Sequence, residues 1–279
     1  MKRNFWVAAS LALAGVIAVG GVTMRADNDD NRGQAGCSRL PSWSKLKDAL
    51  IAARLAANGG LNLDMWGTLV NRDGTVCAVA FTGGNRGDQW PGSRVISAQK
   101  ANTANAFSLP KLALSTANLY TATQPGGSLF GLQLSNPVNT DAAYAGPAAA
   151  YGTAGDPMVG SRIGGINVFG GGLALYDADH QLLGGLGVSG DTSCADHNIA
   201  YRTRHTLELD YVPAGVAGGT KKDNIIFDIV EQGGGDAAPG AGQMPGVSAS
   251  GFGHVSCHGY NAGANAISAA AAAPIPNNR

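Results

Sequence analysis

The stretch LLGGLGVSGDTSCADHNIAYRTRHTLELD, residues 182–210, decides the fold. An apolar run leads into Gly185, Gly187 and Gly190, which spell G-x-G-x-x-G, and a segment with helical character follows. In a parallel βαβ unit this spacing marks a dinucleotide-binding loop. An acidic residue, Asp210, even follows Gly190 by 20 residues. Whether the glycines bind a nucleotide depends on how the apolar run pairs with its neighbours.

The runs in front of the glycines favour an antiparallel sheet. Strand-like segments cover residues 166–169, 173–176 and 182–188, and only the turn DADHQ separates the last two. Because parallel neighbours need a crossover of about a dozen residues or more, we expect antiparallel pairing. The motif then lacks the βαβ setting that a dinucleotide requires. The glycines are better explained by a strand that passes closely by a neighbouring element.

Other segments carry clear local signals. Asn71-Arg72-Asp73-Gly74 separates two β-rich runs and predicts a hairpin, because Asp-Gly suits the positive φ of a tight turn. Helical spacing and capping residues predict a first helix that begins at Ser42 or Ser44 and ends at Gly59. By the same signals, another helix runs from Asp191, Thr192 or Ser193 to about Leu207. Further helices are expected over 94–108 and 108–124, and a last strand over 224–230.

The composition excludes some classes of partner. The 279 residues include 42 glycines, 14% charged residues and a formal net charge of +0. Such a chain offers no electrostatic attraction to nucleic acid or to an anionic membrane surface.

The first residues are typical of a secretory signal. Lys2 and Arg3 precede an apolar run from Phe5 to about Val22, and a polar stretch follows. We expect a signal peptide over residues 1–26 and a periplasmic or secreted protein. Cleavage near Gly20 or Gly21, or an uncleaved membrane anchor, are alternatives at this point.

Export makes two disulfides the default for the four cysteines. Pairing Cys37 with Cys77 and Cys194 with Cys257 is favoured, because it ties each flanking segment to the central domain. The alternatives are a reactive thiol at Cys194, next to a helix start, or a metal site formed by Cys257 with His254 and His258.

Four motifs, taken in order, resemble one known family. They are LVNRDGTVCAVAFTGG, SAQKANTANAFS, GGINVF and LLGGLGVSGDTSCADHNIA, and the similarity covers about residues 42–210. The family is that of GlcG/HbpS-like haem-binding proteins, whose domain also occurs at the C-terminus of PduO-type proteins. The loop GGNRGDQWPGS departs from the family's usual Arg-Met-Asp-Gly-Ala.

The resemblance implies a profilin-like α+β domain, in which helices pack on an antiparallel sheet of about five strands and copies commonly assemble into homo-oligomers. The expected organisation is a signal peptide at 1–26, a linker at 27–41, the domain at 42–210 with an insertion at 124–163, and a C-terminal extension at 211–279. Low-complexity segments predict a loosely ordered end of this extension.

The implied cofactor is haem, with corrinoid less favoured. Haem binding requires an axial donor on iron and cations for the propionates. The candidate iron ligand is His197, at the start of the predicted helix, with Tyr or Thr ligation as the alternative. Arg86, Lys100 and Arg202 are candidate cations, and Thr103 lies in the Lys-Ala-x-Thr-Ala motif.

No catalytic residue is assigned. Ser189 lacks the G-x-S-x-G elbow of a serine hydrolase. The leading interpretation is an exported haem-binding protein that stores, senses or handles its ligand. The alternatives are an enzyme acting on a small organic molecule in the same pocket, and a structural or assembly subunit.

Overall fold

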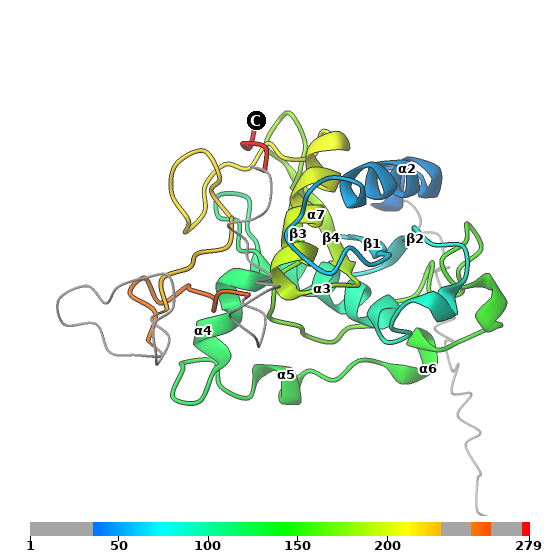
Figure 1. Cartoon of the computed structure of the whole chain (residues 1–279), viewed down its shortest axis with the longest axis horizontal. Helices are drawn as coiled ribbons and strands as arrows, with labels where there is room; N and C mark the ends of the chain where they lie inside the picture. The colour runs from blue at the N-terminus through cyan, green and yellow to red at the C-terminus, as the bar shows by residue number, and fades with distance from the viewer. Residues whose placement is uncertain (1–35, 230–246, 258–274) are drawn as a thin grey trace, which may run out of the picture.

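The computed structural model describes residues 36–229, 247–257 and 275–279 (Figure 1). Its main elements are α2 (Trp43–Arg54), β1 (Trp66–Asn71), β2 (Val76–Phe81), α3 (Ser93–Phe107), β3 (Gly172–Tyr176), β4 (Leu182–Ser189) and α7 (Ser193–Thr206). Shorter helices are η1 (Arg86–Asp88), η2 (Thr116–Leu119), α4 (Tyr120–Thr123), α5 (Leu132–Ser135), α6 (Thr140–Ala143) and η3 (Ala148–Ala150). The predicted signal peptide lies outside the described residues.

The strands form one antiparallel sheet in the order β2-β1-β4-β3. The β1–β2 hairpin turns where the sequence predicts, and Gly74 adopts a φ of 75° there. Strand β4 pairs antiparallel with both β1 and β3. The three-glycine motif therefore has no parallel βαβ setting, and the chain has the predicted α+β architecture.

Glycines in β4 allow helix α3 to lie directly on the sheet. A Cβ at Gly185 would collide with the carbonyl oxygen of Ala101, and one at Gly187 with that of Ser97. Both carbonyls belong to α3, so helix and strand approach backbone to backbone. This contact explains two glycines of the G-x-G-x-x-G motif, Gly185 and Gly187, by packing rather than by nucleotide binding.

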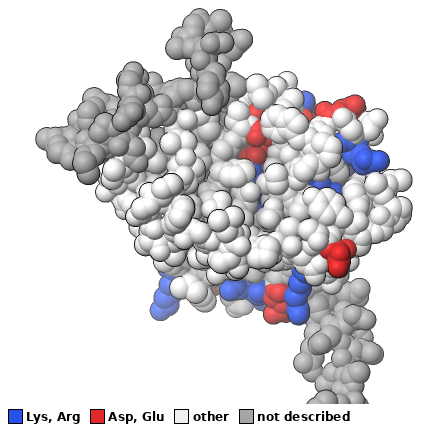
Figure 2. Space-filling view, turned by 90° about the horizontal axis from the view of Figure 1, so that it is seen from below, with Lys and Arg blue, Asp and Glu red and all other residues white. Residues whose placement is uncertain are grey.

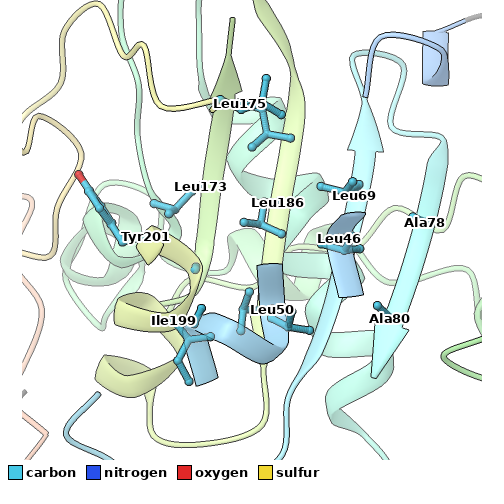
Figure 3. Packing of buried hydrophobic residues seen from close by; sticks show 14 of the residues in the cluster. Leu46, Leu50, Leu69, Ala78, Ala80, Leu173, Leu175, Leu186, Ile199 and Tyr201 are labelled. Atoms are coloured by element: carbon cyan, nitrogen blue, oxygen red, sulfur yellow. The ribbon is translucent and has the colours of Figure 1, made fainter. Parts of the chain in front are cut away.

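The sheet is covered on both faces. Helix α3 packs on one face, together with residues Ala143, Met158 and Ile163 of the insertion. Helices α2 and α7 cover the other face, where leucines from both sides of the interface interdigitate (Figure 3). Burial of these side chains, at about 1.5–3 kcal/mol each, is the main favourable contribution to this fold.

Three local predictions were wrong. Residues 166–169 form no strand, because their backbone bonds to side chains instead: Asn167 N–H donates to Thr103 Oγ1 and Phe169 C=O accepts from Thr116 Oγ1. The predicted helix over 108–124 is reduced to η2 and α4, since Ser115 caps a new start. Residues 224–228 form no strand, and Ile229 makes only an isolated bridge. The sheet consequently has four strands among the described residues rather than about five.

Both disulfides have the pairing that the sequence favours, Cys37–Cys77 and Cys194–Cys257. The described parts of the C-terminal extension are hydrogen-bonded to the domain rather than loose. Arg279, for example, donates to the His205 carbonyl, and Asn118 donates to the Asn224 carbonyl. The low-complexity segments 230–246 and 258–274 lie outside the described residues.

The close approach of α3 to β4 predicts a severe effect of Gly187→Ala. The added methyl group meets helix backbone that has no room to move, so the free energy of unfolding should fall by about 3 kcal/mol. Gly84→Ala is the matched control, because nothing lies within 4 Å of its Cβ position, and it should stay within about 1 kcal/mol of wild type. Urea denaturation measures both, and equal stabilities would contradict the packing described.

Candidate functional site

Lys100 and Asp196 form a buried ion pair where α3, β4 and α7 meet. The Lys100 Nζ atom lies 2.6 Å from Asp196 Oδ2 and also donates to the Val188 carbonyl at 3.0 Å. Both side chains are almost fully buried. Burial raises the pKa of Asp196 to about 6 and lowers the pKa of Lys100. The pair joins three elements, and Lys100 has no free approach for a ligand carboxylate.

His197 is also buried, behind the C-terminal extension. Its Nε2 accepts a hydrogen bond from the Ile225 N–H at 3.1 Å, and its ring lies against Tyr201. Burial lowers the pKa of His197 to about 3, so the ring is neutral at physiological pH. In this conformation Nε2 already has a partner, so ligation of iron through this nitrogen requires Ile225 to move away. The other ring nitrogen, Nδ1, is buried and has no hydrogen-bond partner among the described residues.

The extension is fastened over the start of α7 at a second point. Ser193 Oγ lies 2.8 Å from His254 Nε2, and the next residue, Cys194, is disulfide-bonded to Cys257. Because Cys257 is in the disulfide, its sulfur is not available as the thiolate ligand of the alternative metal site. His258, the third residue of that alternative, lies outside the described residues. Among the described residues, no three His, Cys, Asp or Glu side chains gather as a metal site.

The remaining predicted site residues lie apart from one another. Thr103 is buried and its hydroxyl donates to the Gln99 carbonyl. Arg202 bonds to Asn58 near the end of α2. Arg86 is exposed and lines a groove formed with residues of α2 and of the insertion. The five candidates are therefore not brought together, and of them only Arg86 borders this groove.

This groove, here called the Trp43 groove, is an open cavity of about 450 Å³. Three segments that are distant in sequence form it: the start of α2, the loop after β2, and the insertion after η3. Its lining residues are Trp43, Lys47, Phe81, Gly83, Gly84, Asn85, Arg86, Ala149, Tyr151, Gly152 and Thr153.

Hydrogen bonds and a buried ion pair fix the insertion wall of the Trp43 groove. Trp43 Nε1 donates to the carbonyls of Val79 and Gly152, which ties α2 to both β2 and the insertion. Tyr151 stacks on the guanidinium of Arg94, 3.6 Å from the ring centroid. Arg94 in turn pairs with the buried Asp156.

The lining of the Trp43 groove suits a flat ligand that carries carboxylates. Aromatic rings supply apolar surface, and Lys47 and Arg86 supply positive charge without any acidic side chain in the lining. A neighbouring cavity of about 560 Å³ is larger, but Asp48 and Glu208 line it beside its cations. Those carboxylates would repel an anionic ligand. Sequence analysis finds Arg86 but misses Trp43, Lys47 and Tyr151.

Within the described residues, no helix is both long enough and apolar enough to cross a membrane.

Comparison with known proteins identifies the same family that the sequence motifs resemble. The model of a family described as "Haem degrading protein HbpS-like" matches residues 45–204. A solved PduOC:heme complex is similar with a TM-score of 0.40 and 24% identity, over 58% of this chain and 89% of that chain. Klebsiella pneumoniae protein ORFY is similar with a TM-score of 0.41 and 23% identity, over 59% and 86%. Among curated proteins none matches significantly.

The buried histidines predict a loss of stability in acid. Burial lowers the pKa of His197 to about 3 and that of His254 to about 4. Between pH 6.5 and these values the unfolded chain binds protons that the folded chain does not, so stability falls as the pH falls. Each histidine contributes a slope of up to about 1.4 kcal/mol per pH unit. Asp196, whose pKa is raised, instead makes the folded protein more stable as the pH falls. This contribution is the same in wild type and in the histidine variants, so it cancels when they are compared.

Urea denaturation from pH 7 to 4.5 tests this for His197→Gln and His254→Gln. Each variant should show a shallower dependence of stability on pH than wild type, by about one proton. His180→Gln, in the exposed turn between β3 and β4, is the control and should keep the wild-type slope. Unchanged slopes in both buried-histidine variants would show that these rings titrate normally in the folded protein.

Proposed function

The chain belongs to the HbpS-like family, and we propose that it is an exported protein that binds haem in the Trp43 groove and stores, senses or handles it. The observation that carries the proposal is the lining of this groove. It combines aromatic surface with two cations and no carboxylate, which matches an apolar macrocycle that bears two propionates.

The residues of the groove have separate expected roles. Lys47 and Arg86 would pair with the propionates, while Trp43 and Phe81 would face the macrocycle. Tyr151 is of a type that ligates haem iron in other proteins. Its hydroxyl donates to the carbonyls of Tyr144 and Ala145 here, and it would have to leave them to bind iron. Bound haem would supply an iron centre for redox or oxygen chemistry. Corrinoid is the less favoured ligand of the same groove.

The family description also favours a second function, degradation of haem. Degradation and storage predict different fates for bound haem under a reductant and oxygen. Loss of the Soret band with release of iron would support degradation, whereas a stable band would support storage or sensing.

Haem titration of the mature protein tests the site. We expect a shifted Soret band that saturates at one haem per chain. Reversing both groove cations, Lys47→Glu with Arg86→Glu, should weaken binding roughly tenfold or more, since about 1.4 kcal/mol corresponds to a factor of ten. Lys45→Glu is the matched control, because Lys45 lies on the same helix but lines a different cavity.

The iron ligand is tested by the spectrum rather than by affinity alone. Tyr151→Phe should shift the Soret band if Tyr151 is the ligand, and His197→Gln should leave it unchanged. A shift caused only by His197→Gln would place the haem behind the extension and refute the groove. Absence of any shifted band in wild type would refute haem binding.

Export is supported by the two disulfides, which persist in oxidising compartments. Expression of the full chain in a Gram-negative host should give a periplasmic product whose N-terminus follows Ala26, by mass spectrometry. A start near residue 21 would only move the cleavage site, whereas a full-length chain retained in the cell would contradict export.

A further inference from the structure

The insertion between the two halves of the domain is almost uncharged. From residue 112 to residue 161 the sequence contains only two charged side chains, Asp141 and Asp156. Asp156 is buried in its pair with Arg94, so it contributes no charge to the surface. Figure 2 views the molecule from the side of α4, α5 and α6 in Figure 1, and shows a broad face on which charged side chains lie mainly at the margins.

Large apolar side chains are exposed on this part of the chain. Leu134 is 86% exposed, Phe130 is 64% exposed and Tyr144 is 57% exposed. Phe130 directly precedes the N-cap of α5, Gly131, and Leu134 lies within α5. Exposed apolar side chains on one connection of a protein are typical of a surface that contacts another molecule.

The segment that carries α4 and α5 is held in place by the rest of the fold. Leu129 N–H donates to the Ala122 carbonyl at the end of α4, and Asn139 N–H donates to the Ile163 carbonyl. Ala143 and Met158, further along, are in the core beneath α3. Phe252 of the extension, 36% exposed, reaches the same region, because Thr121 in α4 donates to the neighbouring Gly253 carbonyl.

We infer that the α4–α5 surface, defined by Phe130, Leu134 and Phe252, is the interface with a second copy of this chain. The near absence of charge on this surface favours a second copy of the chain as the partner, because the partner surface is then equally uncharged. A face without cations attracts neither nucleic acid nor anionic lipid, and one with hardly any anions attracts no basic protein. A two-fold axis would place the uncharged face against itself, where neither side must desolvate a charge.

The size of the insertion is sufficient for such an interface. A stable protein–protein contact takes roughly 20–30 residues from each side. Residues 124–163 alone provide enough chain, even though part of this segment lines the Trp43 groove. The inference does not depend on haem, because the α4–α5 surface and the groove use different residues.

Leu134→Glu tests the interface in the oxidised, ligand-free protein. By analytical ultracentrifugation we expect wild type to be dimeric in the micromolar range and Leu134→Glu to be monomeric, with an unchanged circular dichroism spectrum. Leu55→Glu is the matched control, since Leu55 is 70% exposed beside α2, and it should remain dimeric. A dimer that survives Leu134→Glu would overturn the assignment.

A photo-crosslinking amino acid at position 134 gives an independent readout. It should yield a product of twice the chain mass whose crosslinked peptides both come from the insertion, while the same group at position 55 should yield none. A monomeric wild type would refute the inference. A monomer that sediments with phosphatidylcholine vesicles through Leu134 would refute it in favour of a lipid contact.

Discussion

The backbone contact between α3 and β4 is the constraint on which the rest of the structure depends. Because Gly185 and Gly187 carry no side chain, the helix lies against the strand itself. Lys100, on the same helix, can then reach both the Val188 carbonyl and Asp196 at the start of α7. One close approach thus fixes a helix on each face of the sheet, and the desolvation of Lys100 is offset by a short ion pair and a hydrogen bond.

The proposed functional surfaces lie at the edges of this centre. Lys100 and Asp196 are paired with each other in the interior, so they stabilise the junction of α3, β4 and α7 rather than receive a ligand. The Trp43 groove instead lies where the insertion returns to the hairpin, and Arg94 with Asp156 holds that return in position. The same insertion supplies the wall of the groove and the uncharged α4–α5 surface, so the two proposals assign one long connection two separate roles.

Much of the fold follows from local chemistry in the sequence. The Asp73-Gly74 turn, the capped start of α7 and the short connection between β3 and β4 each depend on neighbouring residues, and all three could be predicted. Residues 166–169 could not, since hydroxyls from Thr103 and Thr116 replace the partner strand. The site was harder still. The groove unites three distant segments, so the sequence indicates Arg86 but neither the aromatic residues nor Lys47.

The second disulfide has a consequence for the integrity of the chain. Cys194 and Cys257 are separated by 63 residues, and much of the extension lies between them. A single cut of the backbone anywhere between α7 and Cys257 would leave the C-terminal piece covalently attached to the domain. In an oxidising compartment, where reductants are scarce, the extension would survive such a nick as part of the same molecule.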